Sequence, residues 1–297
     1  MRRKTARSRL EILLGALCPL VILALALAGC GGVTTQATSN TQPPGVLNVV
    51  VSIVPQQYFV ERIGGEHVNV TVMVPPGFSP ATYEPKPEQL RALSEADVYV
   101  RIRVPFEEAW MDRIVSANDD MLIVDESVGI ERIDGKDPHI WLSLRLVKTQ
   151  AQTIYDGLVE LDSDHEADYQ ANLEMFLADL DELDVYIQET LSHLENPKFL
   201  VFHPAWSYFA RDYGLEMISV QIEGSDPSAA EMADLVHAAQ ENNIKVIFAQ
   251  PEFSTESAKA VAEEIGGEVL LISPLAPDWL DNLYRVADTF AEVLAGR

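Results

Sequence analysis

Short apolar runs alternate with amphipathic segments along most of the chain, and this alternation constrains the fold more than any other feature. Apolar runs of this length predict strands, and the segments between them favour helices, as at 228–241 and 255–265. The predicted strands are 46–53, 67–74, 97–103 and 121–124 in the first half, and 198–202, 215–220, 245–249 and 268–272 in the second. Strands that alternate with helices favour parallel sheets with helices on both faces. We therefore predict an α/β protein of two βα lobes, each with a four-stranded, mostly parallel sheet.

One long polar-amphipathic stretch separates the two sets of strands. From about His165 to Leu194, apolar side chains recur near helical spacing, and no glycine or proline interrupts the stretch. The apolar seam is too irregular for the strict heptads of a coiled coil. We predict one long, rigid helix that joins the lobes. The resulting division is an N-terminal lobe at 46–164, a linking helix at 165–195 and a C-terminal lobe at 196–297.

The N-terminus has the composition of an export signal. Five basic residues among the first nine precede an apolar stretch from Ile12 to Ala28. The stretch ends in Leu27-Ala28-Gly29-Cys30, which has the form of a lipoprotein cleavage site followed directly by cysteine. A plain membrane anchor is the alternative, but the run is short for a spanning helix and contains Pro19. We predict a signal peptide at 1–29 and a lipid on Cys30, which places the protein on the extracytoplasmic face of the membrane.

The segment at 30–45 is rich in Gly, Ser, Thr, Gln and Pro, and we expect a flexible tether there. Since Cys18 lies inside the signal, the processed chain keeps only Cys30, so that neither a disulfide nor a thiolate metal site is expected. The first 29 residues hold five of the 21 basic and one of the 46 acidic side chains, which leaves 16 against 45 and a formal charge of −29. This excess argues against a nucleic-acid partner. It would attract cations, although a solvated acidic surface is the simpler explanation.

Two histidines follow predicted strands at the ends where ligands bind in open α/β sheets. His139 lies in the loop after the fourth strand, and His203 directly follows the fifth. Loops at 75–85, 223–227, 250–252 and 273–275 follow other strands, and all would converge if both sheets point their carboxyl ends at one cleft. Imidazoles from two lobes indicate a metal site between them, but two imidazoles are only half of a closed zinc site.

Several short motifs occur in one order along the chain. They are Ser52-Ile53-Val54-Pro55, Ile63-Gly64-Gly65, the Pro-Gly-x-x-Pro-x-x-Tyr-Glu-Pro loop from Pro76 to Pro85, Asp137-Pro138-His139-Ile140-Trp141-Leu142, the run from Tyr208 to Leu215, and Ser273-Pro274-Leu275. Each is weak alone, but together, behind a lipoprotein signal, they resemble the substrate-binding lipoproteins of zinc and manganese ABC importers. The resemblance covers essentially the whole processed chain.

The resemblance implies one divalent metal ion, bound between the lobes by up to four side chains. His139 and His203 match two of the family's ligand positions. Ala81 stands where the family has a histidine in the Tyr-Glu-Pro loop, and Ser273 stands where it often has an aspartate. Alanine cannot bind a metal, and a neutral hydroxyl is a poor substitute for a carboxylate towards Zn²⁺. The acidic, His-rich loop of many zinc-specific members is absent from 128–136.

Other side chains could complete such a site or support it. Glu84, Glu223 and Glu252 lie in the predicted cleft loops, and Ser273 is a further candidate ligand or supporting residue. A bracing role in its loop is the simpler explanation for Glu84. Glu223 precedes a predicted helix, where an acid is favoured in any case. The four remaining histidines fit ordinary surface positions.

These features predict a lipid-anchored, monomeric solute-binding protein that captures a divalent metal, zinc before manganese, and passes it to an ABC permease. No enzyme is expected, because the chain has no His-Glu-x-x-His, no Gly-x-Ser-x-Gly and no phosphate-binding loop. The alternative is a protein of the same fold that has lost metal binding, as Ala81 and Ser273 suggest, and that carries a small non-metal solute or acts in surface adhesion.

Overall fold

The computed structural model describes residues 45–221 and 228–295, and the predicted strands are all present there. The strands are β1 Leu47–Ile53, β2 Val68–Val74, β3 Val98–Arg101, β4 Leu122–Asp125, β5 Lys198–Val201, β6 Glu216–Ser219, β7 Val246–Ala249 and β8 Glu268–Leu271. The predicted signal peptide with Cys30, most of the tether, and Glu223 lie outside the described residues.

Nine α-helices and four short 3-10 helices are found in the described ranges. The α-helices are α1 Val54–Gly64, α2 Pro87–Ser94, α3 Pro105–Ala117, α4 Leu144–Leu161, α5 Glu166–Leu191, α6 Ser207–Tyr213, α7 Ala229–Glu241, α8 Glu256–Ile265 and α9 Trp279–Leu294. The 3-10 helices are η1 Gly65–His67, η2 Ile133–Gly135, η3 Ile140–Leu142 and η4 Ser163–His165.

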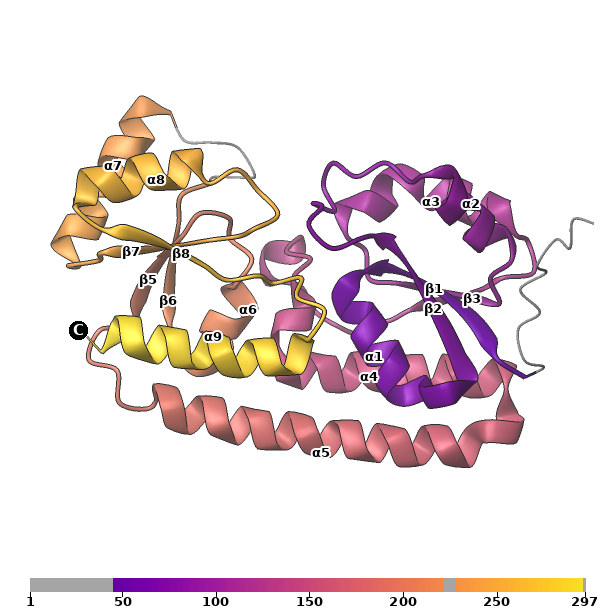
Figure 1. The fold of residues 1–297 in the computed structure, drawn as a ribbon. Coiled ribbons are helices and arrows are strands. Elements are labelled where there is room, and N and C mark those ends of the chain that lie inside the picture. Colours follow the sequence, from indigo (N-terminus) through magenta and orange to yellow (C-terminus); the bar gives the residue numbers. More distant parts are fainter. Residues whose placement is uncertain (1–44, 222–227, 296–297) are drawn as a thin grey trace, which may run out of the picture. The chain divides into compact units, whose positions relative to one another are not determined.

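The strands form two four-stranded sheets with the orders β2-β1-β3-β4 and β6-β5-β7-β8, and every pairing is parallel. Helices cover both faces of each sheet: α2 and α3 lie opposite α1 and α4 in the first lobe, and α7 and α8 lie opposite α6 and α9 in the second (Figure 1). The predicted fold class is thus confirmed. We retain 46–164 and 196–297 as the proposed bounds of the two lobes.

Local sequence explains why the first sheet has this form. In β1 the last five residues are all buried, as expected for a central parallel strand covered on both faces. The third strand is shorter than the predicted 97–103, because the backbone leaves the sheet after Arg101. The amides of Ile102 and Arg103 donate to the carboxylate of Glu107 instead of to a neighbouring strand, and Arg103 adopts a φ of 61°.

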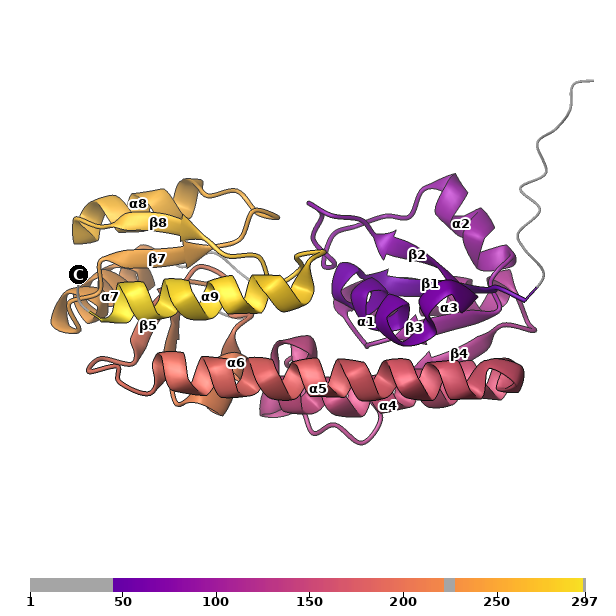
Figure 2. The same cartoon turned by 60° about the horizontal axis from the view of Figure 1, so that its bottom comes forward.

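The long helix α5 runs past both sheets and packs on helices of both lobes (Figures 1 and 2). It has 26 residues and ends at Leu191, four residues before the predicted end at 195. Its neighbours are α1 and α4 of the first lobe and α9 and α6 of the second. The side chains that it buries recur at helical spacing, from Tyr169 and Leu173 to Leu191. No helix within 45–221 or 228–295 is both long and apolar enough to cross a membrane.

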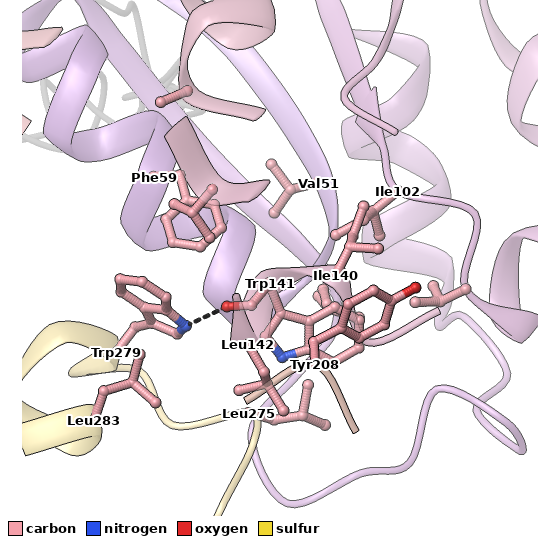
Figure 3. Close-up of a cluster of buried hydrophobic side chains, with 14 of the residues drawn as sticks. Val51, Phe59, Ile102, Ile140, Trp141, Leu142, Tyr208, Leu275, Trp279 and Leu283 are labelled. Carbon is pink, nitrogen blue, oxygen red and sulfur yellow. Dashed lines mark hydrogen bonds between the residues drawn. The ribbon is translucent and has the colours of Figure 1, made fainter. Parts of the chain in front are cut away.

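Two buried tryptophans connect the lobes directly. Trp279, at the start of α9, donates from Nε1 to the carbonyl oxygen of Trp141 in η3 over 3.1 Å (Figure 3). Its ring meets Phe59 of α1 edge-on, with the centroids 4.9 Å apart. Trp141 in turn donates from Nε1 to the carbonyl oxygen of Pro274 over 2.7 Å. One hydrophobic core therefore contains side chains of both lobes.

Candidate functional site

A cleft of about 580 Å³ lies where the carboxyl ends of the two sheets meet. Its walls come from the loops that follow β2, β3, β4, β5, β7 and β8. The convergence predicted for the loops at 75–85, 250–252 and 273–275 and for the two histidines is therefore confirmed. The loop at 223–227 lies outside the described residues. A space of this size at the carboxyl edges of parallel sheets is where such folds bind their ligands.

His139 reaches this cleft from the turn before η3, and Asp137 fixes its orientation. One carboxylate oxygen of Asp137, Oδ1, accepts both the backbone N–H of His139 over 3.0 Å and Nδ1 of its ring over 2.7 Å. Since a carboxylate accepts hydrogen bonds, Nδ1 carries the hydrogen, and in the neutral form of the ring Nε2 has a free lone pair.

His203 follows β5 and has the same arrangement on the opposite wall. Its Nδ1 lies 3.0 Å from Oε1 of Gln221, which is an acceptor, so Nδ1 again carries the hydrogen and Nε2 is bare. The ring of Phe253, from the loop after β7, lies with its centroid 5.2 Å from that of His203 and shields one side.

The Nε2 atoms of the two rings face each other. Nε2 of His139 lies 3.4 Å from Nε2 of His203, and the ring planes are inclined at 72°. Two lone pairs at this distance repel unless a proton or a metal ion lies between them. Two imidazoles on a tetrahedral Zn²⁺, with bonds of 2.0–2.1 Å, have their nitrogens about 3.3–3.4 Å apart. The spacing therefore fits one cation held by both rings.

The surroundings keep His203 neutral. Its burial, and next the nearby ring of His139, lower the pKa of His203 to about 4. Burial alone would raise the pKa of Asp137, but the hydrogen bonds from His139 outweigh it and hold this pKa below its usual value. A neutral imidazole next to an ionised aspartate is the protonation state that a divalent cation requires.

Burial of a neutral His203 predicts that the metal-free protein loses stability as the pH falls from about 6.5 towards 4. In this window the unfolded imidazole, with a pKa of about 6.5, takes up a proton, whereas the folded one, with a pKa of about 4, does not. The proton therefore favours unfolding, by about 2 kcal/mol at pH 5 relative to pH 7.

Urea unfolding at pH 7 and pH 5, with a chelator present, would measure this loss. His203→Gln should lack this part of the pH dependence, while His237→Gln, at a position where 71% of the side chain is exposed, should retain it. An identical pH dependence in the wild type and His203→Gln would contradict the burial argument.

The other predicted site residues occupy different places. Ala81 lines the cleft, whereas Glu84 is exposed and is not among the lining residues. Ser273 donates from Oγ to Oε1 of Glu252 over 2.6 Å and accepts the N–H of Leu275. Glu252 itself lines the cleft. Within the described ranges, no three His, Cys, Asp or Glu side chains surround one point closely enough to hold a metal ion.

Sequence reasoning missed the residues that orient the two histidines. Gln221 lies 18 positions after His203 and meets it only because β6 pairs with β5. Asp137 was recognisable, since it belongs to the same short motif as His139. No sequence pattern indicated that the ring of Phe253 packs on His203.

Comparison with known proteins gives a consistent result. Residues 49–293 match the family model described as "Zinc-uptake complex component A periplasmic". The manganese-binding lipoprotein MntA of Halalkalibacterium halodurans is 29% identical in sequence. The match covers 93% of this chain and 97% of the relative. The high-affinity zinc uptake system protein ZnuA of Bacillus subtilis is 28% identical in sequence. The match covers 84% of this chain and 85% of the relative.

Solved structures agree with this result. A crystal structure of ZnuA is 48% identical in sequence and superimposes with a TM-score of 0.81, covering 84% of this chain and 99% of its own. A ZnuA deletion mutant with zinc bound is 47% identical and also has a TM-score of 0.81, with coverage of 85% and 99%. The matched region contains both lobes and the cleft between them, and the chain therefore belongs to the ZnuA family of metal-uptake binding proteins.

Proposed function

We propose that this protein is the extracytoplasmic solute-binding component of an ABC importer, and that it binds one divalent metal ion between His139 and His203. The observation that carries the proposal is the pair of Nε2 atoms, 3.4 Å apart across the cleft. Each imidazole is fixed through its Nδ1, by Asp137 in one case and Gln221 in the other. Such outer partners hold ligand rings in the orientation that a metal requires.

Zinc is the first candidate and manganese the second. Imidazole nitrogen suits Zn²⁺ well, whereas Mn²⁺ prefers carboxylate, carbonyl and water oxygens. Relatives named for both metals match most of this chain. The alternative of a binding protein that has lost metal binding is less favoured, because the two Nε2 atoms have the spacing of two ligands on one Zn²⁺ ion.

We further propose that the protein works as a monomer at the outer face of the membrane, anchored through a lipid on Cys30. The lipoprotein motif Leu27-Ala28-Gly29-Cys30 supports the anchor. The role as the metal-binding partner of a membrane permease follows from the family. In this arrangement the protein binds and releases its cargo without changing it chemically, so that no catalytic residue is assigned.

Calorimetric titration of the metal-free, full-length chain in detergent tests the proposal. We expect saturable binding of one Zn²⁺ per chain and weaker binding of Mn²⁺. Mg²⁺ is the matched control, because it prefers oxygen ligands and should give no comparable heat. An absence of saturable zinc binding would refute the proposed function.

Asp137→Asn should weaken zinc binding by about 10- to 100-fold, the usual cost of losing an outer partner of a histidine ligand. The amide keeps the size of the side chain but removes the negative charge that fixes the tautomer of His139. Competition with a chelating dye would measure the change. Asp119→Asn is the control, because it makes the same change of charge at an exposed position that does not line the cleft. Equal affinities of the two variants would contradict a role of Asp137 in orienting His139.

A further inference from the structure

The two imidazoles leave the positive charge of a bound cation without a balancing anion. Both rings are neutral ligands, and a divalent ion taken into a partly buried cleft needs negative charge close by. Among the residues that the structure describes, three acids line the cleft: Asp134, Asp137 and Glu252. Asp137 is hydrogen-bonded to the ring of His139, and Asp134 is exposed to solvent. Of these three described acids, Glu252 is the one that remains.

The surroundings of Glu252 are unusual for a carboxylate. It follows β7 and immediately precedes Phe253, whose ring packs on His203. Its Oε1 accepts the hydroxyl of Ser273 over 2.6 Å. Its Oε2 is buried and has no hydrogen-bond partner in the part of the chain that the structure describes. A buried carboxylate oxygen without a partner lowers the stability of the folded protein, so that a role in binding would explain its presence.

We propose that Glu252 supplies the carboxylate of the cation site through Oε2, while Ser273 holds Oε1 and positions the group. This inference rests on the proposed function and names a third ligand for the same site. In the metal-free structure no three such side chains converge, so that Glu252 must turn about its side-chain bonds to reach the ion. The cation makes this turn favourable, because it gives Oε2 the partner that it lacks. Ser273 is then a positioning residue and not a ligand.

Zinc titrations of four variants of the full-length chain in detergent test this assignment. Glu252→Gln should weaken binding at least about 10-fold, the lower limit for losing even an outer partner. Ser273→Ala should weaken it less, because the carboxylate remains. Adding Ser273→Asp to Glu252→Gln should restore most of the affinity, since the new carboxylate lies at the hydroxyl that Glu252 contacts. Glu264→Gln is the control: it makes the same change of charge at an exposed position on α8 and should bind normally.

The absorption spectrum of bound Co²⁺ provides a readout that a purely structural role would not change. Its visible bands depend on the ligand set, so they should differ between the wild type and Glu252→Gln but not between the wild type and Glu264→Gln. Unchanged zinc affinity in Glu252→Gln, beside lost binding in His203→Ala, would overturn this inference alone. A weakened Glu252→Gln that Ser273→Asp does not rescue would also overturn it. A wild type that binds no zinc would overturn the proposed function as well.

Discussion

Zinc affinity is expected to fall by at least about 100-fold when either His139 or His203 is replaced by alanine. Loss of only an outer partner of a ligand costs about 10- to 100-fold, and loss of the ligand itself should cost more. Each variant leaves a single imidazole in the cleft, because the two bare Nε2 atoms belong to these two rings. The double variant should show no saturable heat in calorimetry.

The control for this experiment is His237→Ala, which removes an imidazole from the exposed surface of α7. It should bind zinc as the wild type does. Equal, partial losses in all three single variants would contradict the assignment, because they would show weak binding by scattered histidines. Circular dichroism of each variant should match the wild type, since both cleft histidines lie in loops rather than in the sheets.

Trp279→Ala should lower the free energy of unfolding by about 3–5 kcal/mol, the usual cost of truncating a fully buried large aromatic side chain. The side chain has no exposed surface. Its loss would leave a cavity against Phe59 and remove the hydrogen bond to the carbonyl oxygen of Trp141. Urea unfolding of the metal-free protein at neutral pH would measure the change.

Trp110→Ala is the matched control for this variant. Trp110 lies on α3 and is partly exposed, and its ring stacks on Phe106 of the same helix and contacts the guanidinium of Arg113. We expect a loss of less than about 2 kcal/mol, within the range of ordinary substitutions. A similar loss for both tryptophans would contradict the importance of the contact between the lobes.

The sheets were predictable because their signal is local. Continuous apolar runs such as Val49–Ile53 lie in strands that are covered on both faces, and the helices between them have their own periodicity. The end of β3 was not predictable, because it depends on Glu107. This residue lies on the following helix, and its carboxylate accepts hydrogen bonds from the amides of Ile102 and Arg103. The sequence shows the acid but not the direction in which it points.

The candidate site was predictable only in part, for a related reason. His139 and His203 could be found because both follow predicted strands, and parallel strands bring such positions to one edge. The contact of Glu252 with Ser273 joins two loops 21 positions apart in the chain, and no spacing rule relates them. The hydroxyl of Ser273 was considered as a ligand, whereas the structure shows it bonded to an acid.

The packing of α5 on helices of both lobes also limits how such a protein can diverge in evolution. Recombination that exchanged one lobe for that of a relative would disturb this packing. After such an exchange, one end of α5 and the ring of Trp279 would contact a lobe from another protein, whose side chains had not evolved to pack against them. New metal preferences are therefore expected to arise by single substitutions in the cleft loops, for example at Ala81, rather than by the exchange of whole lobes.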